Sequence, residues 1–358
     1  MERFSCPVQI ISGPGALEEL KSFHIERLLV VTDPYFEKNG TAARVAALAK
    51  ESQIFSGVQP DPTVEQVAVG TATVKSFQPD CVAALGGGST MDCAKAMVWF
   101  SGVKAKLIAI PTTSGSGSEV TNFAVVTHED VKHPLIDDTL LPSVAVLDSD
   151  LLEELPKRLI ADTGFDVLCH ALEAYTAKNA GAITDALARD AFCTAFAYLP
   201  ASYNGKLEVR STIHTAATMA GMAFSQAGLG LCHALSHALG GMFHLPHGRL
   251  NAILLPAVVE LNAQVCGPKL AKLSRSAGLG GAADTVAVRN LKNGLIRLRK
   301  DLELPATLAQ AGVQPRQVQR SAAQIIAAAK LDPCMKTAPF CPEDFMLYRL
   351  LEEVTGHV

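Results

Sequence analysis

The first 150 residues alternate short apolar runs with longer segments whose apolar positions recur at helical spacing. The aliphatic, partly β-branched runs predict strands at 28–31, 81–85 and 107–110. The periodic segments predict helices at 41–50, 64–77 and 91–100. Strands that alternate with helices favour a parallel sheet with helices on both faces, and ligands bind at the carboxyl ends of such strands.

From about Asp150 this alternation stops, and Ala- and Leu-rich helical periodicity continues to the end of the chain. We therefore expect two domains, an α/β domain over residues 1–155 and an all-helical domain over residues 156–358. Within the helical half, breaks are expected at Asn204-Gly205, Gly240-Gly241 and Pro246.

The stretch from Ser211 to Gly248 contains no Asp, Glu, Lys or Arg, so a membrane segment has to be considered. We reject it, because the stretch carries five histidines, a glutamine and several Ser and Thr, which would be costly in lipid. A pair of helices buried in a large domain fits better, and no membrane partner is expected.

Composition excludes several other classes. Lys and Arg number 31 against 35 Asp and Glu, a formal net charge of −4, so no basic surface is expected to bind nucleic acid. Apolar residues make up 49%, which is ample for a large core. The nine cysteines are odd in number and form no C-x-x-C pair, and no signal peptide opens the sequence. We expect free thiols and a cytoplasmic location.

Residues Gly86-Gly87-Gly88-Ser89 follow the second predicted strand and open a helix. Glycine lets the backbone approach a phosphate closely, and a helix N-terminus presents N–H groups to negative charge. The loop can therefore hold a diphosphate, or it can be a tight strand-to-helix turn without a ligand. It does not have the G-x-G-x-x-G spacing, so the motif alone does not decide between them.

Two further loops follow the other predicted strands. Asp33 can accept a hydrogen bond from a ribose hydroxyl and would repel a 2′-phosphate, which favours NAD over NADP. Taken alone, a turn residue before Pro34 is the simpler interpretation of Asp33. The loop 111–119 is rich in hydroxyls and small residues, suited to a nucleotide but also to a flexible surface loop. Three such loops at three strand ends together favour cofactor binding.

The helical half concentrates histidines. His233, His237, His244 and His247 fall within 15 residues, and Asp166 and His170 stand at i and i+4, on one face of a helix. For each histidine separately, a buried core side chain or a helix cap is the ordinary interpretation. As a group in a charge-free apolar segment, three imidazoles and one carboxylate favour a tetrahedral site for a divalent metal ion. Cys169 and Cys232 adjoin presumed ligands but should point away from the ion.

Four segments together resemble the iron-containing (group III) alcohol dehydrogenases, and the resemblance runs over nearly the whole chain. They are residues 86–95 (GGGSTMDCAK), 111–121 (PTTSGSGSEVT), 166–174 (DVLCHALEA) and 228–248, which contains GLGLCHALSH and HLPHG. Two positions depart from the family pattern: Thr90 stands where proline is frequent, and Cys169 where threonine is frequent.

The resemblance implies a dinucleotide-binding α/β domain with a parallel sheet and an all-helical metal-binding domain, a dehydroquinate synthase-like fold. It implies that the metal ligands are Asp166, His170, His233 and His247. His237 would lie beside the nicotinamide and substrate without binding the ion. The implied NAD site consists of Asp33, Gly87, Gly88, Ser89, Thr112, Thr113, Ser116, Thr121 and Lys132.

The implied activity is NAD(H)-dependent interconversion of a primary alcohol and its aldehyde, with Fe²⁺ as the metal and Zn²⁺ as an alternative occupant. Residues 95–101 and 220–231 are similar to 1-propanol or ethanol dehydrogenases of bacterial propanediol and ethanolamine utilisation. The family resemblance implies a homodimer, and the closer similarity implies association with the shell or lumen proteins of a bacterial microcompartment. The alternatives are a polyol or diol dehydrogenase of the same fold (1,3-propanediol, lactaldehyde or glycerol), a metal-dependent hydrolase or lyase, and a non-catalytic scaffold.

Overall fold

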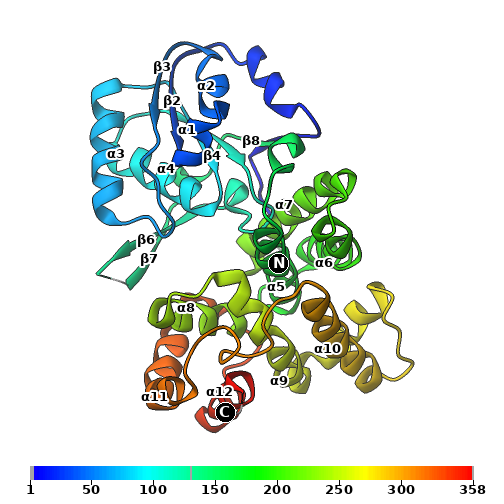
Figure 1. Cartoon of the computed structure of the whole chain (residues 1–358). Coiled ribbons are helices and arrows are strands. Elements are labelled where there is room, and N and C mark those ends of the chain that lie inside the picture. Colours follow the sequence, from blue (N-terminus) through cyan, green and yellow to red (C-terminus); the bar gives the residue numbers. More distant parts are fainter. Residues whose placement is uncertain (1–3, 130, 357–358) are drawn as a thin grey trace. The chain divides into compact units, whose positions relative to one another are not determined.

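The computed structural model describes residues 4–129 and 131–356. The chain divides into two compact units, Ser5–Leu155 and Pro156–Val358, which we describe separately. The first is an α/β unit around a parallel sheet and the second is helical (Figure 1), so the expected fold class is confirmed.

The sheet of the first unit has six strands in the order β1-β8-β5-β4-β2-β3, and every pair in it is parallel. Its strands are β1 (Gln9–Ser12), β2 (Ile25–Thr32), β3 (Ala49–Phe55), β4 (Cys81–Gly86), β5 (Lys106–Pro111) and β8 (Val144–Leu147). A separate antiparallel hairpin is formed by β6 (Phe123–His128) and β7 (Val131–Ile136).

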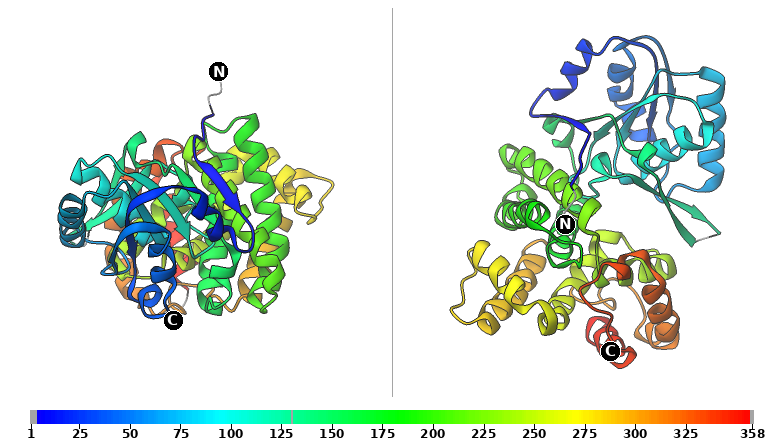
Figure 2. Two further views of the ribbon diagram at one scale, coloured as in Figure 1. Left: turned by 90° about the horizontal axis from the view of Figure 1, so that it is seen from above. Right: turned by 180° about the vertical axis from the view of Figure 1, so that it is seen from behind.

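Successive residues of β2 pack into two hydrophobic cores, one on each face of the sheet, because side chains alternate between the faces of a strand. Leu28 and Val30 pack with the 3₁₀ helix Ala16–Ser22 and with α1 (Pro34–Lys38) and α2 (Thr41–Ala46). Leu29 and Val31 pack with α3 (Val64–Phe77) and α4 (Gly88–Ser101), so helices cover both faces of the sheet (Figures 1 and 2). A central strand buried on both faces reads as a continuous apolar run, which explains why it could be predicted.

The carboxyl ends of the central strands lie at one edge of the sheet. Thr32 of β2 pairs with Leu85 of β4, and Gly86 pairs with Pro111 of β5. The chain leaves β2 toward β3 on one side and leaves β4 toward β5 on the other, so the strand order reverses between β2 and β4. Such a reversal opens the crevice in which parallel sheets bind ligands.

The predicted helix 41–50 is wrong beyond Ala46, because residues 49–55 form the edge strand β3. Most side chains of β3 are exposed, so this strand has no apolar run that would identify it in the sequence. Its backbone pairing with β2 holds it in the sheet. The short edge strand β1, the strand β8 and the hairpin of β6 and β7 were also not predicted from the sequence.

The second unit consists of long helices in which α5 packs against α6, α7 and α9 (Figures 1 and 2). The charge-free stretch forms two helices, α7 and α8, as predicted, whereas the expected break at Gly240-Gly241 is wrong because α8 continues to Phe243. The helices are α5 (Lys157–Thr176), α6 (Ala182–Tyr203), α7 (Arg210–Ala227), α8 (Leu231–Phe243), α9 (His247–Ser276), α10 (Asp284–Asp301), α11 (Pro315–Leu331) and α12 (Asp344–Thr355).

Helix α9 is apolar and long enough to cross a membrane, but 61% of its apolar window is buried in the protein, as in a core helix. Pro256 lies inside α9 and has no N–H to donate to the carbonyl of Ala252. The buried guanidinium of Arg299 on α10 replaces it, since its Nη1 donates to Ala252 O at 3.2 Å and to Ile253 O at 3.4 Å. Arg299 thus supports the helix that begins at His247.

We predict that Arg299→Ala lowers the melting temperature of the helical unit. An unpaired buried carbonyl costs about 2 kcal/mol, which corresponds to roughly 4–8 °C for a unit of this size. Pro256→Ala should recover part of the loss in this background, because it restores an N–H to the helix. Calorimetric scans of the two single variants and the double variant at one scan rate measure this. Equal effects of Pro256→Ala in the wild type and in the Arg299→Ala variant would contradict it.

Candidate metal centre and cofactor-binding loops

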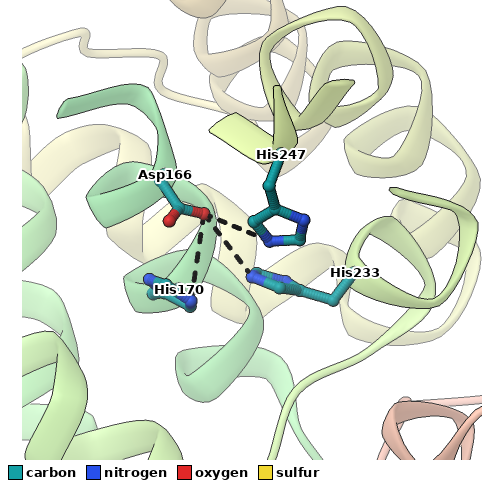
Figure 3. A group of neighbouring side chains, drawn as sticks. All are labelled: Asp166, His170, His233 and His247. Atoms are coloured by element: carbon teal, nitrogen blue, oxygen red, sulfur yellow. Dashed lines mark ion pairs between the residues drawn. The ribbon is translucent and has the colours of Figure 1, made fainter. Parts of the chain in front are cut away.

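Four side chains from three helices meet in the helical unit (Figure 3). Asp166 and His170 come from α5, His233 from α8, and His247 is the first residue of α9. The Oδ1 atom of Asp166 lies 3.9 Å from His170 Nε2, 3.8 Å from His233 Nε2 and 3.5 Å from His247 Nε2. The structure therefore brings together all four residues that the resemblance implies as metal ligands.

Local sequence explains the approach of these helices. Asp166 and His170 are one helical turn apart, and Pro246 starts α9 with His247 directed at them. Gly248 lies so close to α5 that a Cβ atom there would be 2.0 Å from the carbonyl oxygen of Asp162. The Arg249 guanidinium also forms a buried ion pair with the Asp162 carboxylate at 2.6 Å. These contacts hold the start of α9 against α5.

The donor set fits a divalent metal ion. Bond lengths of about 2.1 Å to a tetrahedral ion place its ligands about 3.4 Å apart, close to the observed separations. His233 Nε2 is buried and has no hydrogen-bond partner among the described residues. Burial lowers the pKa of His233 and His247 well below the usual value, so both imidazoles are neutral, the form that binds metals. The His247 side chain keeps 31% of its surface exposed, whereas that of His233 exposes 1%.

Glu173 orients His233 from behind. Its Oε2 atom lies 2.7 Å from His233 Nδ1, which directs the opposite ring nitrogen, Nε2, toward Asp166. The same carboxylate accepts the backbone N–H groups of Gly230, Cys232 and His233 at the start of α8. Burial raises the pKa of Glu173 to about 7, although these N–H groups favour the charged form. One carboxylate thus caps the helix and aligns its histidine.

Asn251 performs a related role one turn into α9. Its Nδ2 atom donates to Asp166 Oδ1 at 2.7 Å and lies 3.2 Å from His247 Nε2. Its Oδ1 atom accepts from the hydroxyl of Ser236 at 2.5 Å. Asn251 therefore fixes the rotamer of the buried Asp166 carboxylate.

His237 stands outside the group of four. Its ring stacks on His247 with centroids 5.2 Å apart, and its Nδ1 atom lies 2.8 Å from Asp332 Oδ2. Burial raises the pKa of Asp332, but the hydrogen bond and charge of His237 outweigh this and hold it below its usual value. The His237 side chain is 36% exposed, in contrast to the fully buried His233.

In the α/β unit, two predicted loops lie against each other. A Cβ atom at Gly88 would be 3.1 Å from the Ser116 side chain, and one at Gly87 would be 3.3 Å from Thr113 Oγ1. Helix α4 begins at Gly88, and its N-cap residue, Gly87, has no side chain that could cap it. Its first N–H groups therefore suit an anion such as a diphosphate.

The buried Lys95 and the half-buried Asp92 hold the loop after β5 in place. The ammonium group of Lys95 donates to the carbonyl oxygens of Ser118, Thr121 and Phe123 and to two hydroxyls. Asp92 accepts from Ser118 Oγ at 2.8 Å and from the backbone N–H of Val125 at 3.1 Å. Burial lowers the pKa of Lys95 to about 8, so it remains mostly charged at neutral pH. Lys95 and Asp92 of the 86–95 motif thus hold the backbone of residues 118–125 in place.

The other predicted cofactor residues occupy different environments. Asp33 follows β2 and caps α1, with Oδ1 accepting from the N–H groups of Tyr35 and Phe36. Ser89 Oγ and Lys132 Nζ both contact Asp61, at 3.3 and 2.6 Å. Thr112 and Thr121 are buried, and Thr121 holds Lys95.

Comparison with known proteins decides the family. The profile of the iron-containing alcohol dehydrogenases matches residues 7–149, and that of the C-terminal part of the Fe-containing alcohol dehydrogenase family matches residues 160–344. The chain belongs to the iron-containing alcohol dehydrogenase family. This confirms the resemblance and the enzyme class.

Two relatives align with the dehydrogenase over nearly its whole length. The 1-propanol dehydrogenase PduQ of Citrobacter freundii is 39% identical over 99% of this chain and 100% of the relative. The NADPH-dependent butanol dehydrogenase of Clostridium saccharobutylicum is 37% identical over 95% of this chain and 94% of the relative.

A solved structure adds the cofactor. The sulfoacetaldehyde reductase from Bifidobacterium kashiwanohense in complex with NAD⁺ has a TM-score of 0.88 and 26% identity, covering 99% of this chain and 98% of that chain. Together with the iron-containing family description, this confirms at the level of the family the expected iron and NAD(H).

Four residues that contact the predicted site residues were not predicted from the sequence: Glu173, Asn251, Asp332 and Asp61. Glu173 and Asn251 each lie one turn from an implied ligand, so their helical spacing could have identified them. Asp332 lies 95 residues from His237, and Asp61 lies 71 residues from Lys132, so no local pattern connects either pair.

We predict that His233→Ala weakens divalent metal binding by at least about tenfold. Loss of a residue that merely orients a metal ligand already lowers metal affinity by at least about tenfold, and this substitution removes a ligand itself. Metal content per chain after dialysis against a buffered metal solution measures it. His244→Asn is the matched control, since His244 is exposed and ends α8 outside the group of four. Wild-type metal affinity in His233→Ala would contradict the ligand assignment.

Proposed function

We propose that this dehydrogenase interconverts a short primary alcohol, 1-propanol or ethanol, and its aldehyde by hydride exchange with NAD(H). The convergence of Asp166, His170, His233 and His247 within 4.8 Å carries this proposal. The name of the 1-propanol dehydrogenase relative supports the choice of alcohol, and the butanol dehydrogenase relative supports the class of short alcohols.

In this proposal the four residues hold a divalent ion, Fe²⁺ or Zn²⁺, which when bound supplies Lewis acidity toward the alcohol oxygen, while NAD supplies the hydride acceptor. Glu173 and Asn251 keep the donor atoms of His233 and Asp166 aligned. Their hydrogen bonds reduce the rearrangement needed when the ion binds, which strengthens the site.

His237 accepts the alcohol proton in this proposal. Its Nδ1 hydrogen bond to Asp332 assigns the ring proton to Nδ1 and leaves a lone pair on Nε2. The partly exposed ring can then pass the proton to solvent, and Asp332 stabilises the imidazolium that forms.

The cofactor site of the proposal lies at the edge of the sheet where β2 and β4 end. Gly87, Gly88 and Ser89 hold the diphosphate at the start of α4, and Thr112, Thr113, Ser116, Thr121 and Lys132 complete the site. Both backbone contacts of Asp33 use Oδ1, so Oδ2 can accept from a ribose hydroxyl. This carboxylate favours NAD over NADP.

The remaining expectations from the resemblance form part of the same proposal. They are a homodimer, a cytoplasmic location, and association with shell or lumen proteins of a bacterial microcompartment. A polyol or diol dehydrogenase of the same fold is the second candidate, since the same metal and cofactor sites serve it.

A homologous series of alcohols tests the proposed function. We expect NADH formation with ethanol and 1-propanol at a higher kcat/KM than with glycerol or 1,3-propanediol, after loading with Fe²⁺ or Zn²⁺ without oxygen. The reverse order of kcat/KM would support the polyol alternative. The absence of NADH formation with every alcohol, in protein with one metal ion per chain, would contradict the proposal.

We predict that Asp33→Asn raises the ratio of kcat/KM for NADP to that for NAD by about tenfold, equivalent to 1.4 kcal/mol. Asparagine retains an oxygen that can cap α1, so the change removes chiefly the negative charge. Glu37→Gln, which removes an exposed charge from the same helix, should leave the ratio unchanged. An equal ratio in Asp33→Asn and the wild type would exclude Asp33 from the ribose site.

A further inference from the structure

A second group of metal-binding side chains lies beside the group of four and shares none of its members. His237, Asp332 and Cys334 each offer one donor atom, and these three atoms lie within 4.8 Å of one another. All three residues are partly exposed, and the side chains of His237 and Asp332 expose 36% and 13% of their surface.

We propose that His237, Asp332 and Cys334 form a second, weaker site for zinc or a similarly thiophilic divalent ion. The nitrogen, oxygen and sulfur donors match zinc, whereas Mg²⁺ and Ca²⁺ prefer oxygen ligands alone. Three protein ligands leave the fourth tetrahedral position to water.

The local fold prepares two of the three donors. Asp332 begins the 3₁₀ helix Pro333–Lys336, and its Oδ1 atom accepts from the backbone N–H of Cys334 at 2.8 Å. This contact leaves Oδ2 directed at His237 Nδ1, 2.8 Å away. The carboxylate and the imidazole therefore already meet, and the ion replaces the hydrogen bond between them.

Binding of the ion changes the protonation of Cys334 and His237. The thiol of Cys334 loses its proton to solvent. The ion takes the place of the proton on His237 Nδ1, which also goes to solvent, and Nε2 takes up one proton from solvent. Thiolate and carboxylate together offset the two positive charges of the ion. One proton is released per ion, and the imidazole remains neutral.

The consequence for turnover depends on the proposed function. With its proton on Nε2, His237 can no longer accept the proton of the alcohol. The second ion therefore inhibits oxidation while the group of four remains filled. The stacked rings of His237 and His247 show how closely the two sites adjoin.

The number of zinc ions bound per chain by the zinc-loaded enzyme tests the second site without turnover. We expect equilibrium dialysis against zinc to give two ions per chain in the wild type, one tight and one weaker, and one in Cys334→Ser. Cys341→Ser is the matched control, because Cys341 is also free but lies outside the cluster, and it should keep two. Titration with Cd²⁺ should give a thiolate-to-metal charge-transfer absorbance that only Cys334→Ser loses.

Inhibition supplies the second measurement. The zinc concentration that halves the alcohol dehydrogenase activity of the iron-loaded enzyme should rise at least about tenfold in Cys334→Ser, a change of 1.4 kcal/mol. One zinc ion per chain in both the wild type and Cys334→Ser would overturn the second site. Two ions without inhibition would support the site and overturn the assigned role of His237. Absence of alcohol oxidation would contradict the proposed function and leave the stoichiometry decisive for the site.

Discussion

The buried carboxylate of Asp166 is the constraint on which the helical unit depends. Its Oδ1 atom lies among the imidazoles of His170, His233 and His247 and, within the described part of the chain, accepts one hydrogen bond, from Asn251. A buried carboxylate with few partners is unfavourable, so placing Asp166 among these imidazoles costs folding free energy. A divalent cation at the centre would offset that cost directly. Metal binding and stability of the helical unit are therefore linked, since the ion binds the folded arrangement and not the unfolded chain.

The same device, a buried charge satisfied by backbone groups, positions a functional segment in each unit. Glu173 accepts three N–H groups at the start of α8, and Lys95 donates to three carbonyl oxygens of the loop after β5. Neither needs to touch a ligand to matter, because a side chain that binds several successive backbone groups removes their freedom to move. This explains why Glu173 of the 166–174 motif and Lys95 of the 86–95 motif are buried charged residues.

Sequence patterns predicted what depends on local periodicity. The buried strands β2, β4 and β5 have continuous apolar runs. Asp166 and His170 on α5 have one-turn spacing, and so do His233 and His237 on α8. The polar edge strand β3 was mistaken for the continuation of a helix, because backbone pairing with β2 fixes it and pairing leaves no mark on side-chain composition. The partnership of His237 with Asp332 was likewise out of reach, since 95 residues separate them.

Residues His233 and His237 show how distant partners give two members of one motif different roles. They stand one turn apart on α8, and each has a carboxylate at Nδ1. The partner of His233 is fully buried, so its free nitrogen points into the group of four. The partner of His237, Asp332, is partly exposed, and the His237 ring is accessible to solvent. In the proposed function, the hydrogen bond between His237 and Asp332 prepares His237 to accept a proton. The same contact places a nitrogen and an oxygen beside the Cys334 sulfur, so the proposed proton acceptance and the proposed sensitivity to zinc share one cause.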